Sequence, residues 1–99
     1  VIGAGAMGSL FGGFLALAGE EVWLVDVWQE HIDAINNHGL VLSLAAGEKT
    51  ARPQATVAAE KVGQCDLIII FVKSAATPAA AASAQQMLGP QTAVLTLQN

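Results

Sequence analysis

The chain has 99 residues, 54% of them apolar and 12% charged, with a net charge of −4. This length allows one domain, and the apolar fraction is ample for a buried core. The few basic residues are scattered, which argues against a nucleic-acid partner, and no apolar stretch approaches the ~20 residues needed to span a bilayer. The lone cysteine, Cys65, cannot form a disulfide within the chain, so we expect a cytoplasmic protein.

The chain opens on a glycine-rich turn that joins a short apolar strand to a helix. Val1-Ile2 is followed by Gly3-Ala4-Gly5-Ala6-Met7-Gly8, a G-x-G-x-x-G pattern. Each glycine has its own expected role: Gly3 allows a tight exit from the strand, Gly5 leaves room for a pyrophosphate, and Gly8 lets the helix pack closely on the sheet. Backbone N–H groups and the positive end of the helix bind phosphates in such a turn. We therefore predict a dinucleotide site over residues 3–8.

The next segments continue the pattern of a dinucleotide-binding domain. Helical spacing of apolar residues predicts a helix over about 6–18, ended by Gly19, with these side chains facing the sheet: Met7, Leu10, Phe11, Phe14, Leu15 and Ala18. A second strand is predicted over 21–27, and Asp26 near its end is placed to accept hydrogen bonds from ribose hydroxyls. A glycine turn alone is weak evidence, but strand, turn, helix, strand and acid in this order strengthen it.

The rest of the chain keeps alternating helices and strands. Trp28, Ile32 and Ile35 mark the inward face of a second helix that ends near Gly39. The later expected elements are strands over 40–44 and 49–55 around a hairpin turn, a short polar helix over 57–62, a buried strand over 65–72, an alanine-rich helix from Thr77-Pro78 to Gly89-Pro90 and a strand over 92–97. We therefore predict an α/β fold, a Rossmann-type, doubly wound, mostly parallel sheet with an inserted hairpin.

Polar residues follow two of the predicted strands, at the sheet edge where ligands of doubly wound folds bind. Lys73 and Ser74 follow the 65–72 strand, and Gln98 and Asn99 follow the last one. Lys73 could contact cofactor phosphate or ribose oxygens or a carboxylate substrate, or it could be a solvated loop lysine. Asn99 could hold a nicotinamide or a substrate oxygen in register for transfer, or it could be an ordinary turn residue.

Three motifs together resemble the amino-terminal domain of ketopantoate reductases, also called 2-dehydropantoate 2-reductases. They are Gly3-Ala4-Gly5-Ala6-Met7-Gly8-Ser9-Leu10-Phe11-Gly12, Val72-Lys73 and Leu97-Gln98-Asn99, and the likeness covers essentially the whole chain. In that family the glycine turn binds the cofactor pyrophosphate, the lysine contacts the cofactor, and the asparagine meets nicotinamide and substrate. The resemblance implies these roles for residues 3–8, Lys73 and Asn99.

The resemblance also implies a reaction. A hydride from NADH or NADPH would reduce a 2-oxo acid, with pantoate as the product in pantothenate biosynthesis. The family's catalytic lysine and substrate-binding acid lie in a helical carboxyl-terminal domain, so no catalytic residue is expected within residues 1–99. Only Val1 and Ile2 precede the glycine turn and the chain stops after a strand, so we expect a fragment of a larger two-domain protein. The oligomeric state stays open, with a homodimer as one alternative.

Asp26 departs from many ketopantoate reductases, which use NADPH and have a basic or neutral residue at this position. A carboxylate would repel a 2′-phosphate, so we expect a preference for NADH. Asp26, Trp28, His31 and Ile32 also resemble a stretch of NAD-dependent D-2-hydroxyacid dehydrogenases of the same superfamily, which remain an alternative. A nucleotide-sensing module without catalysis is another, and a helical domain with a catalytic lysine in the full gene would argue against it.

Other chemically capable side chains have simpler interpretations. His31 and His38 lie on one short helix without a cysteine or carboxylate cluster, so we predict solvated surface histidines and no metal site. Cys65 has no neighbouring base and is expected to fill space at the start of a buried strand. Trp28 could flank an adenine or pack on the sheet.

Overall fold

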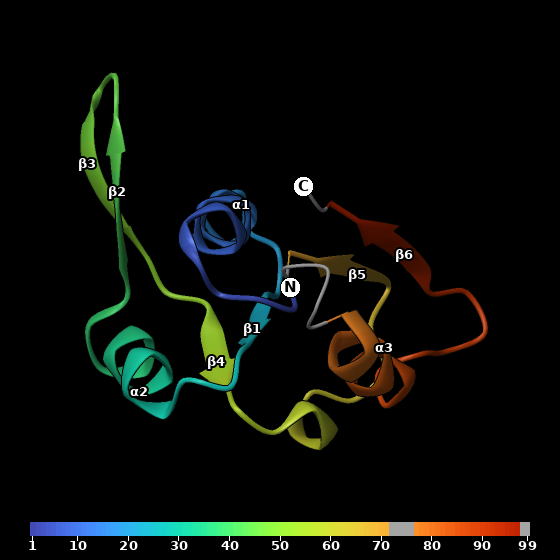
Figure 1. Ribbon diagram of the computed structural model, residues 1–99. Helices are drawn as coiled ribbons and strands as arrows, with labels where there is room; N and C mark the ends of the chain where they lie inside the picture. The colour runs from blue at the N-terminus through green and yellow to red at the C-terminus, as the bar shows by residue number, and fades with distance from the viewer. Residues whose placement is uncertain (72–76, 98–99) are drawn as a thin grey trace.

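A parallel sheet lies at the centre of the computed structural model, which describes residues 1–71 and 77–97 (Figure 1). The helices and strands follow in the order α1 (Ala6–Leu17), β1 (Trp23–Val25), α2 (Gln29–His38), β2 (Leu40–Leu44), β3 (Gly47–Ala51), β4 (Gln54–Thr56), the 3-10 helix η1 (Ala59–Lys61), β5 (Leu67–Ile70), α3 (Thr77–Gln85) and β6 (Ala93–Thr96). The predicted α/β class is confirmed.

The sheet is assembled around Ile2. Strand β1 pairs in parallel with β4, and β5 pairs in parallel with β6. Ile2 joins the two pairs, because it bridges Val25 of β1 on one side and Ile70 of β5 on the other. The spatial order is therefore β4, β1, Ile2, β5, β6, which is the strand order of a doubly wound dinucleotide-binding sheet. The winding direction reverses at Ile2, so a ligand crevice is expected at the carboxyl end of this segment.

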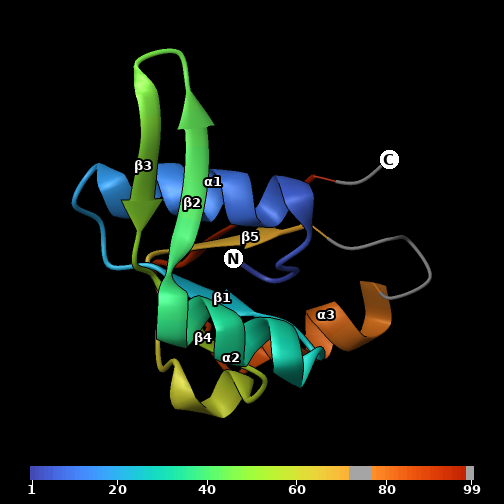
Figure 2. The same ribbon diagram turned by 90° about the vertical axis from the view of Figure 1, so that its left-hand side faces the viewer.

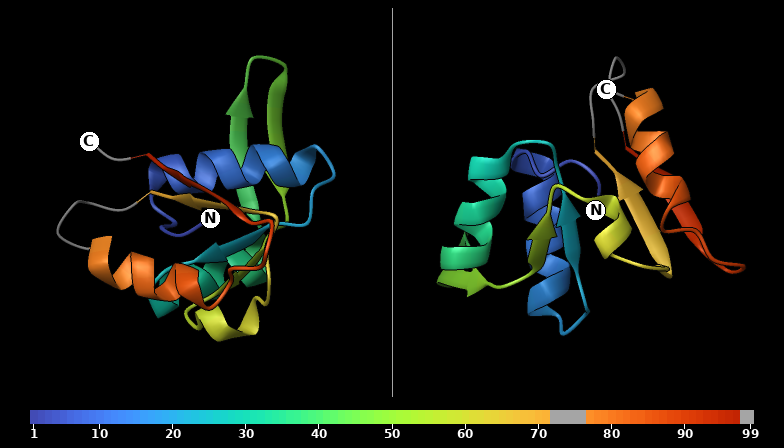
Figure 3. Two further views of the ribbon diagram at one scale, coloured as in Figure 1. Left: turned by 90° about the vertical axis from the view of Figure 1, so that its right-hand side faces the viewer. Right: turned by 90° about the horizontal axis from the view of Figure 1, so that it is seen from below.

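Alternating side chains divide the core into two clusters, one on each face of the sheet. Leu24 of β1 is fully buried toward α1 and α2, whereas its neighbour Val25 is buried toward α3 and η1. The first cluster comprises Ala4, Val22, Leu24, Ile32, Ile35 and Ala55, and the second comprises Ile2, Val25, Ala59, Ile68, Ile70, Ala80, Ala84 and Met87. Figures 2 and 3 show α1 on one side of the sheet and α3 on the other. Both faces of the sheet are thus covered.

Strands β2 and β3 form an antiparallel hairpin that extends away from the parallel sheet (Figure 2). Gly47 begins β3 with a φ of +118°, a conformation that favours glycine. The hairpin packs on α1, since a Cβ atom at Gly13 would lie 2.9 Å from Cδ1 of Leu42. The inserted hairpin is confirmed, but the strand predicted over 49–55 is two strands. Pro53 has no N–H to continue the hairpin ladder, and after it β4 joins the parallel sheet.

The face of α1 that packs on the sheet differs from the prediction. Its buried residues are Gly8, Gly12 and Gly13. By contrast, four larger residues of α1 are each at least 40% exposed, namely Met7, Phe11, Phe14 and Leu17. A Cβ atom at Gly12 would lie 2.6 Å from Cδ2 of Leu24, so the glycines let the helix approach β1 closely. The prediction was wrong for Met7, Phe11, Phe14 and Ala18, whereas Leu15 packs against the core as predicted. Because α1 is apolar on every side, apolar periodicity cannot select the inner face.

Other predicted elements are present with shorter bounds. Strand β1 occupies the centre of the predicted 21–27 strand, and η1 replaces the helix predicted over 57–62. Strand β5 covers residues 67–70 of the predicted 65–72 strand. Ile68, Ile69 and Ile70 are buried, as expected for a strand covered on both faces. Helix α2 ends before Gly39, whose φ is +77°, as predicted. Within residues 1–71 and 77–97, no helix has the length and apolar character to cross a membrane.

Candidate dinucleotide site

The glycine loop, residues 3–8, leaves the carboxyl end of the strand segment at Ile2, beside the ends of β1 and β5. The N–H of Gly3 donates to the carbonyl of Val25 at 2.8 Å, and Gly3 then turns the chain with a φ of +101°. A Cβ atom at Gly8 would lie 1.8 Å from the carbonyl oxygen of Gly3, so no side chain fits there. The tight turn predicted at Gly3 and the close packing predicted at Gly8 are therefore confirmed.

The outer side of the glycine loop is open. Gly5 is the exposed N-cap of α1, and a Cβ atom there would meet no heavy atom within 4 Å. In the described part of the chain, no side chain caps α1, and its first turn holds no acidic residue. The first N–H groups of α1 and the positive end of its dipole, at Ala6 and Met7, are therefore available to an anionic ligand.

Both backbone polar groups of Ala4, in the glycine loop, are hydrogen-bonded to side chains. Its N–H donates to Oδ2 of Asp26 at 2.7 Å. Its carbonyl pairs with Oγ of Ser9 at 2.9 Å and with Nε2 of His31 at 2.6 Å. Ala4 is 1% exposed, so an unpaired N–H or carbonyl at this position would be costly. The end of β1 and the first turns of α1 and α2 together fix the conformation of the loop.

Asp26 lies at the end of the second predicted strand, and its carboxylate faces the glycine loop. The side chain is half-buried, and Oδ1 also accepts the N–H groups of Val27 at 2.7 Å and Trp28 at 3.3 Å. The carboxylate thereby joins the loop to the start of α2, where a negative charge is favourable. Carboxylate oxygens have several acceptor positions, so these bonds leave capacity for ribose hydroxyls. The ribose contact itself stays a prediction.

Trp28 and His31, next to Asp26, differ from the predictions. Trp28 is 61% exposed, so inward packing of this side chain was wrong. His31 is not a solvated surface residue: it is half-buried, hydrogen-bonded to the loop, and stacked on Trp28 with ring centroids 5.4 Å apart and an interplanar angle of 29°. Among the described residues no group of three or more His, Cys, Asp or Glu side chains could hold a metal.

Sequence reasoning missed the roles of Ser9 and His31. His31 follows Asp26 and Trp28 within the first turn of α2, so it returns to the same edge of the sheet as the acid. That spacing was the available signal for His31. Ser9 carried no comparable signal, because a serine in the first turn of a helix is common in any fold.

Lys73 and Asn99 fall outside the described residues, as do Ser74 and Gln98. Their predicted contacts with cofactor and substrate stay predictions. Phe71 is the last described residue before Lys73, and its N–H donates to the carbonyl of Ile2 at 2.8 Å. Its ring also packs against Phe11 of α1, with centroids 5.2 Å apart. Phe71 therefore lies beside the start of the glycine loop and α1.

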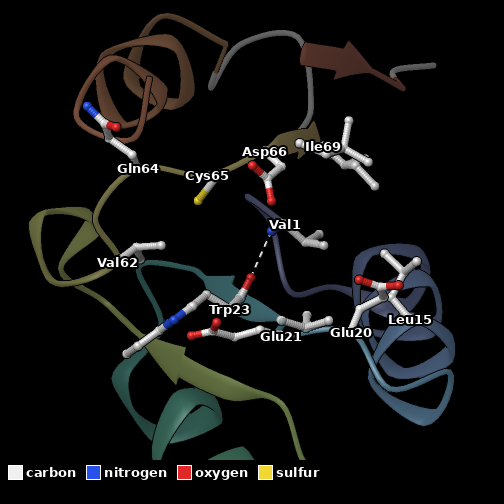
Figure 4. Close-up of a pocket in the computed structure, with 12 residues that line it drawn as sticks. Val1, Leu15, Glu20, Glu21, Trp23, Val62, Gln64, Cys65, Asp66 and Ile69 are labelled. Atoms are coloured by element: carbon white, nitrogen blue, oxygen red, sulfur yellow. Dashed lines mark hydrogen bonds between the residues drawn. The ribbon is translucent and has the colours of Figure 1, made fainter. Parts of the chain in front are cut away.

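A cavity of about 330 Å³ lies at the opposite end of the sheet, where β1 and β5 begin (Figure 4). Its lining includes the acidic residues Glu20, Glu21 and Asp66, together with Cys65. The pKa of the Cys65 thiol is raised, chiefly by burial and further by the carboxylates of Asp66 and Glu21. A protonated thiol is a weak nucleophile, and carboxylates repel phosphate. The glycine loop, rather than this cavity, is the candidate site.

Comparison with known proteins relates this geometry to a family. The model of the ketopantoate reductase PanE/ApbA family matches residues 1–99, the full chain. The chain belongs to the ketopantoate reductase family. The resemblance carried by the glycine turn and by the Lys73 and Asn99 motifs is therefore confirmed, and the open loop at Gly5 is the loop of a ketopantoate reductase family member.

Relatives in the ketopantoate reductase family match this chain along its full length. The 2-dehydropantoate 2-reductases of Lactococcus lactis subsp. lactis and Pyrococcus abyssi are 38% and 41% identical to it over 101 residues. Each match covers 100% of this chain but only 32% of the relative, so the chain spans about a third of the length of these relatives.

Solved structures show the same fold. The PanE/ApbA family ketopantoate reductase from Ralstonia eutropha JMP134 is 37% identical with a TM-score of 0.88, and the match covers 99% of this chain and 33% of that one. A D-mandelate dehydrogenase solved with NADH and anilino(oxo)acetate is 40% identical with a TM-score of 0.86, covering 99% of this chain and 32% of that one.

Proposed function

We propose that the intact protein reduces a 2-oxo acid with a nicotinamide cofactor, and that this chain is its dinucleotide-binding domain. The observation that carries the proposal is the glycine loop. It lies where the winding of the sheet reverses, with open space at Gly5 and an uncapped α1 beside it. These features fit a pyrophosphate bound by the backbone N–H groups of residues 3–8.

The described residues would bind and orient the cofactor. When bound, the reduced nicotinamide supplies the hydride, so the protein's share is position and electrostatics. Asp26 would accept hydrogen bonds from the adenosine ribose, Lys73 would contact the cofactor, and Asn99 would meet nicotinamide and substrate, as the family motifs imply. The hydrogen bonds on Ala4 support this assignment, because a loop already fixed before binding loses little conformational entropy when the ligand arrives.

We propose 2-dehydropantoate as the substrate and pantoate as the product. Family membership and the full-length match to 2-dehydropantoate 2-reductases support this substrate. The matched relatives are about three times as long as this chain. The catalytic lysine and the substrate-binding acid would accordingly lie in a helical domain beyond residue 99, and we place the reaction in the cytoplasm.

We further propose that NADH is preferred over NADPH. The carboxylate of Asp26 stands at the end of β1, where the adenosine ribose of a doubly wound site binds, and it would repel a 2′-phosphate. The 40% identity to a D-mandelate dehydrogenase solved with NADH adds support.

That same likeness favours a second candidate, an NAD-dependent D-2-hydroxyacid dehydrogenase. The D-mandelate dehydrogenase is as similar to this chain as the 2-dehydropantoate 2-reductases are. The two candidates share the cofactor site and differ in the group beside the keto acid. The part of the protein beyond residue 99 would contact that group and so select the substrate.

A steady-state assay of the full-length protein tests both candidates. Ketopantoate and a panel of other 2-oxo acids would each be offered with NADH and with NADPH, and kcat/KM would be compared. We expect selective turnover of ketopantoate and a higher kcat/KM with NADH. Selective turnover of another 2-oxo acid would favour the dehydrogenase, a clear NADPH advantage would contradict the role of Asp26, and cofactor binding without turnover would favour a sensor.

A further inference from the structure

His31 has no proposed contact with the cofactor, yet its side chain contacts the glycine loop. It lies in the first turn of α2, and its Nε2 is 2.6 Å from the carbonyl oxygen of Ala4 in the glycine loop. A carbonyl oxygen only accepts hydrogen bonds, so Nε2 carries the hydrogen and donates it. The donor is therefore present whether or not Nδ1 is also protonated.

The carbonyl that His31 reaches is part of the buried centre of the loop. Ala4 is 1% exposed, and it stands between Gly3, with its φ of +101°, and the open position at Gly5. The Ala4 N–H, which belongs to the preceding peptide group, is held by Asp26. Rotating the Ala4–Gly5 peptide group would break the bonds of the Ala4 carbonyl to Ser9 and His31. The orientation of this peptide group decides where the N–H groups that follow it point.

The same imidazole also holds Trp28. The two rings stack with centroids 5.4 Å apart, and 61% of Trp28 is nevertheless exposed. One face of the indole is thus fixed by His31 while much of the ring stays accessible beside Asp26. A single side chain therefore contacts both the loop and Trp28, whose N–H donates to Asp26.

We propose that His31 is a positioning residue for dinucleotide binding. It fixes the Ala4 carbonyl through Nε2 and orients Trp28 through its ring, so that the glycine loop and the Asp26 region are held in one arrangement. The inference rests on the proposed cofactor site and adds to it a residue that touches neither the pyrophosphate nor the ribose.

Two substitutions in the full-length protein separate the contacts of His31. His31→Phe keeps a ring for Trp28 but has no donor, and His31→Gln keeps an amide donor but has no ring. His38→Phe and His38→Gln are matched controls, because His38 is exposed in the last turn of the same helix. The measurements are the Kd for NADH from fluorescence titration, kcat at saturating NADH, and Tm.

We expect His31→Phe to weaken NADH binding about three- to tenfold, which is the loss of one hydrogen bond expressed as affinity. His31→Gln should recover most of the affinity, kcat should stay within about twofold, and the His38 variants should bind as the wild type does. Equal affinity of wild type and His31→Phe would overturn the inference, as would equal losses of affinity and Tm in both His31 variants. A wild type that binds neither NADH nor NADPH would instead overturn the proposed function.

Discussion

Gly5 and Gly8 belong to the same turn, yet a methyl group added to each would meet different surroundings. At Gly8 it would lie 1.8 Å from the carbonyl oxygen of Gly3, and at Gly5 it would meet nothing within 4 Å. The backbone at Gly5, with a φ of −72°, is also one that alanine adopts readily. One glycine is therefore needed for folding, and the other is needed only if a ligand approaches.

This contrast gives a matched pair of substitutions. Gly8→Ala should lower the free energy of unfolding by about 1–3 kcal/mol, because α1 must move away from the Gly3 carbonyl. Gly5→Ala should change that free energy by less than about 0.5 kcal/mol. In our proposal it should nevertheless weaken NADH binding at least about tenfold, since the methyl occupies the space of the pyrophosphate. Urea denaturation and NADH titration check both variants, and wild-type affinity in Gly5→Ala would contradict the cofactor assignment.

Cys65 gives a prediction about pH. Its thiol pKa is raised, chiefly by burial, so the thiolate forms at a higher pH in the folded protein than in the unfolded chain. The rate of iodoacetamide alkylation should therefore begin to rise at a higher pH for the folded protein than for the same protein in urea. Coincident pH profiles for folded and unfolded protein would contradict the raised pKa.

At the scale of elements, helix α2 is positioned by the side chain of Asn36, whose amide makes the two hydrogen bonds that a neighbouring strand would make. Asn36 accepts the N–H of Ala55 at 3.0 Å and donates to its carbonyl at 2.9 Å. Ala55 belongs to β4, at the edge of the parallel sheet, so the amide of Asn36 takes the place of a further strand there. Helix α2 is thereby joined to the same sheet as the Asp26 end of β1.

Removing this amide should loosen the edge of the sheet. Asn36→Ala leaves both backbone groups of Ala55 without their partner, so we expect the free energy of unfolding to fall by about 1–3 kcal/mol. Asn37→Ala is the control, because Asn37 is the next residue of α2 and is exposed like Asn36, but the bonds to Ala55 come from Asn36. It should change this free energy by less than about 0.5 kcal/mol. Equal effects of the two substitutions in urea denaturation would show that the bonds to Ala55 contribute nothing.

The elements themselves were largely predictable from the sequence, but their orientations were less so. Ile32 and Ile35 of α2 are buried as predicted, because polar residues on the other sides of that helix leave one apolar face. Helix α1 offers no such contrast, and its glycine face could be recognised only once β1 was in place. Similarly, the Asp26 position followed from the order of elements, whereas the contact of His31 with Ala4 depends on how two helices meet in space.

At the scale of the whole molecule, stability should depend most on the strands next to Ile2. Ile68 of β5 is 1% exposed and belongs to the core cluster under α3, whereas Val94, its partner on β6, is 48% exposed. Pairing in the sheet is the same for both residues, so the difference lies in burial.

Truncating each side chain measures that difference. Ile68→Ala should lower the free energy of unfolding by about 2–5 kcal/mol, because it removes buried methylene groups and leaves a cavity. Val94→Ala should cost less than about 1 kcal/mol, because the wild-type side chain is already half in solvent. Urea denaturation with a common m-value compares the two, and a larger loss for Val94→Ala would show that another part of the protein buries β6.

The central place of Ile2 in the sheet also sets an order of events during synthesis. Ile2 is translated before both of its neighbours in the sheet, and one of them, Ile70, is translated long after the other, Val25. The β2–β3 hairpin needs only residues close to each other in sequence and can form while translation continues. Until β5 and α3 have emerged, the nascent chain exposes one unpaired edge at Ile2 and the apolar side of β1 that α3 later covers. Chaperone binding and aggregation of stalled chains should therefore peak before β5 emerges and fall once it has paired.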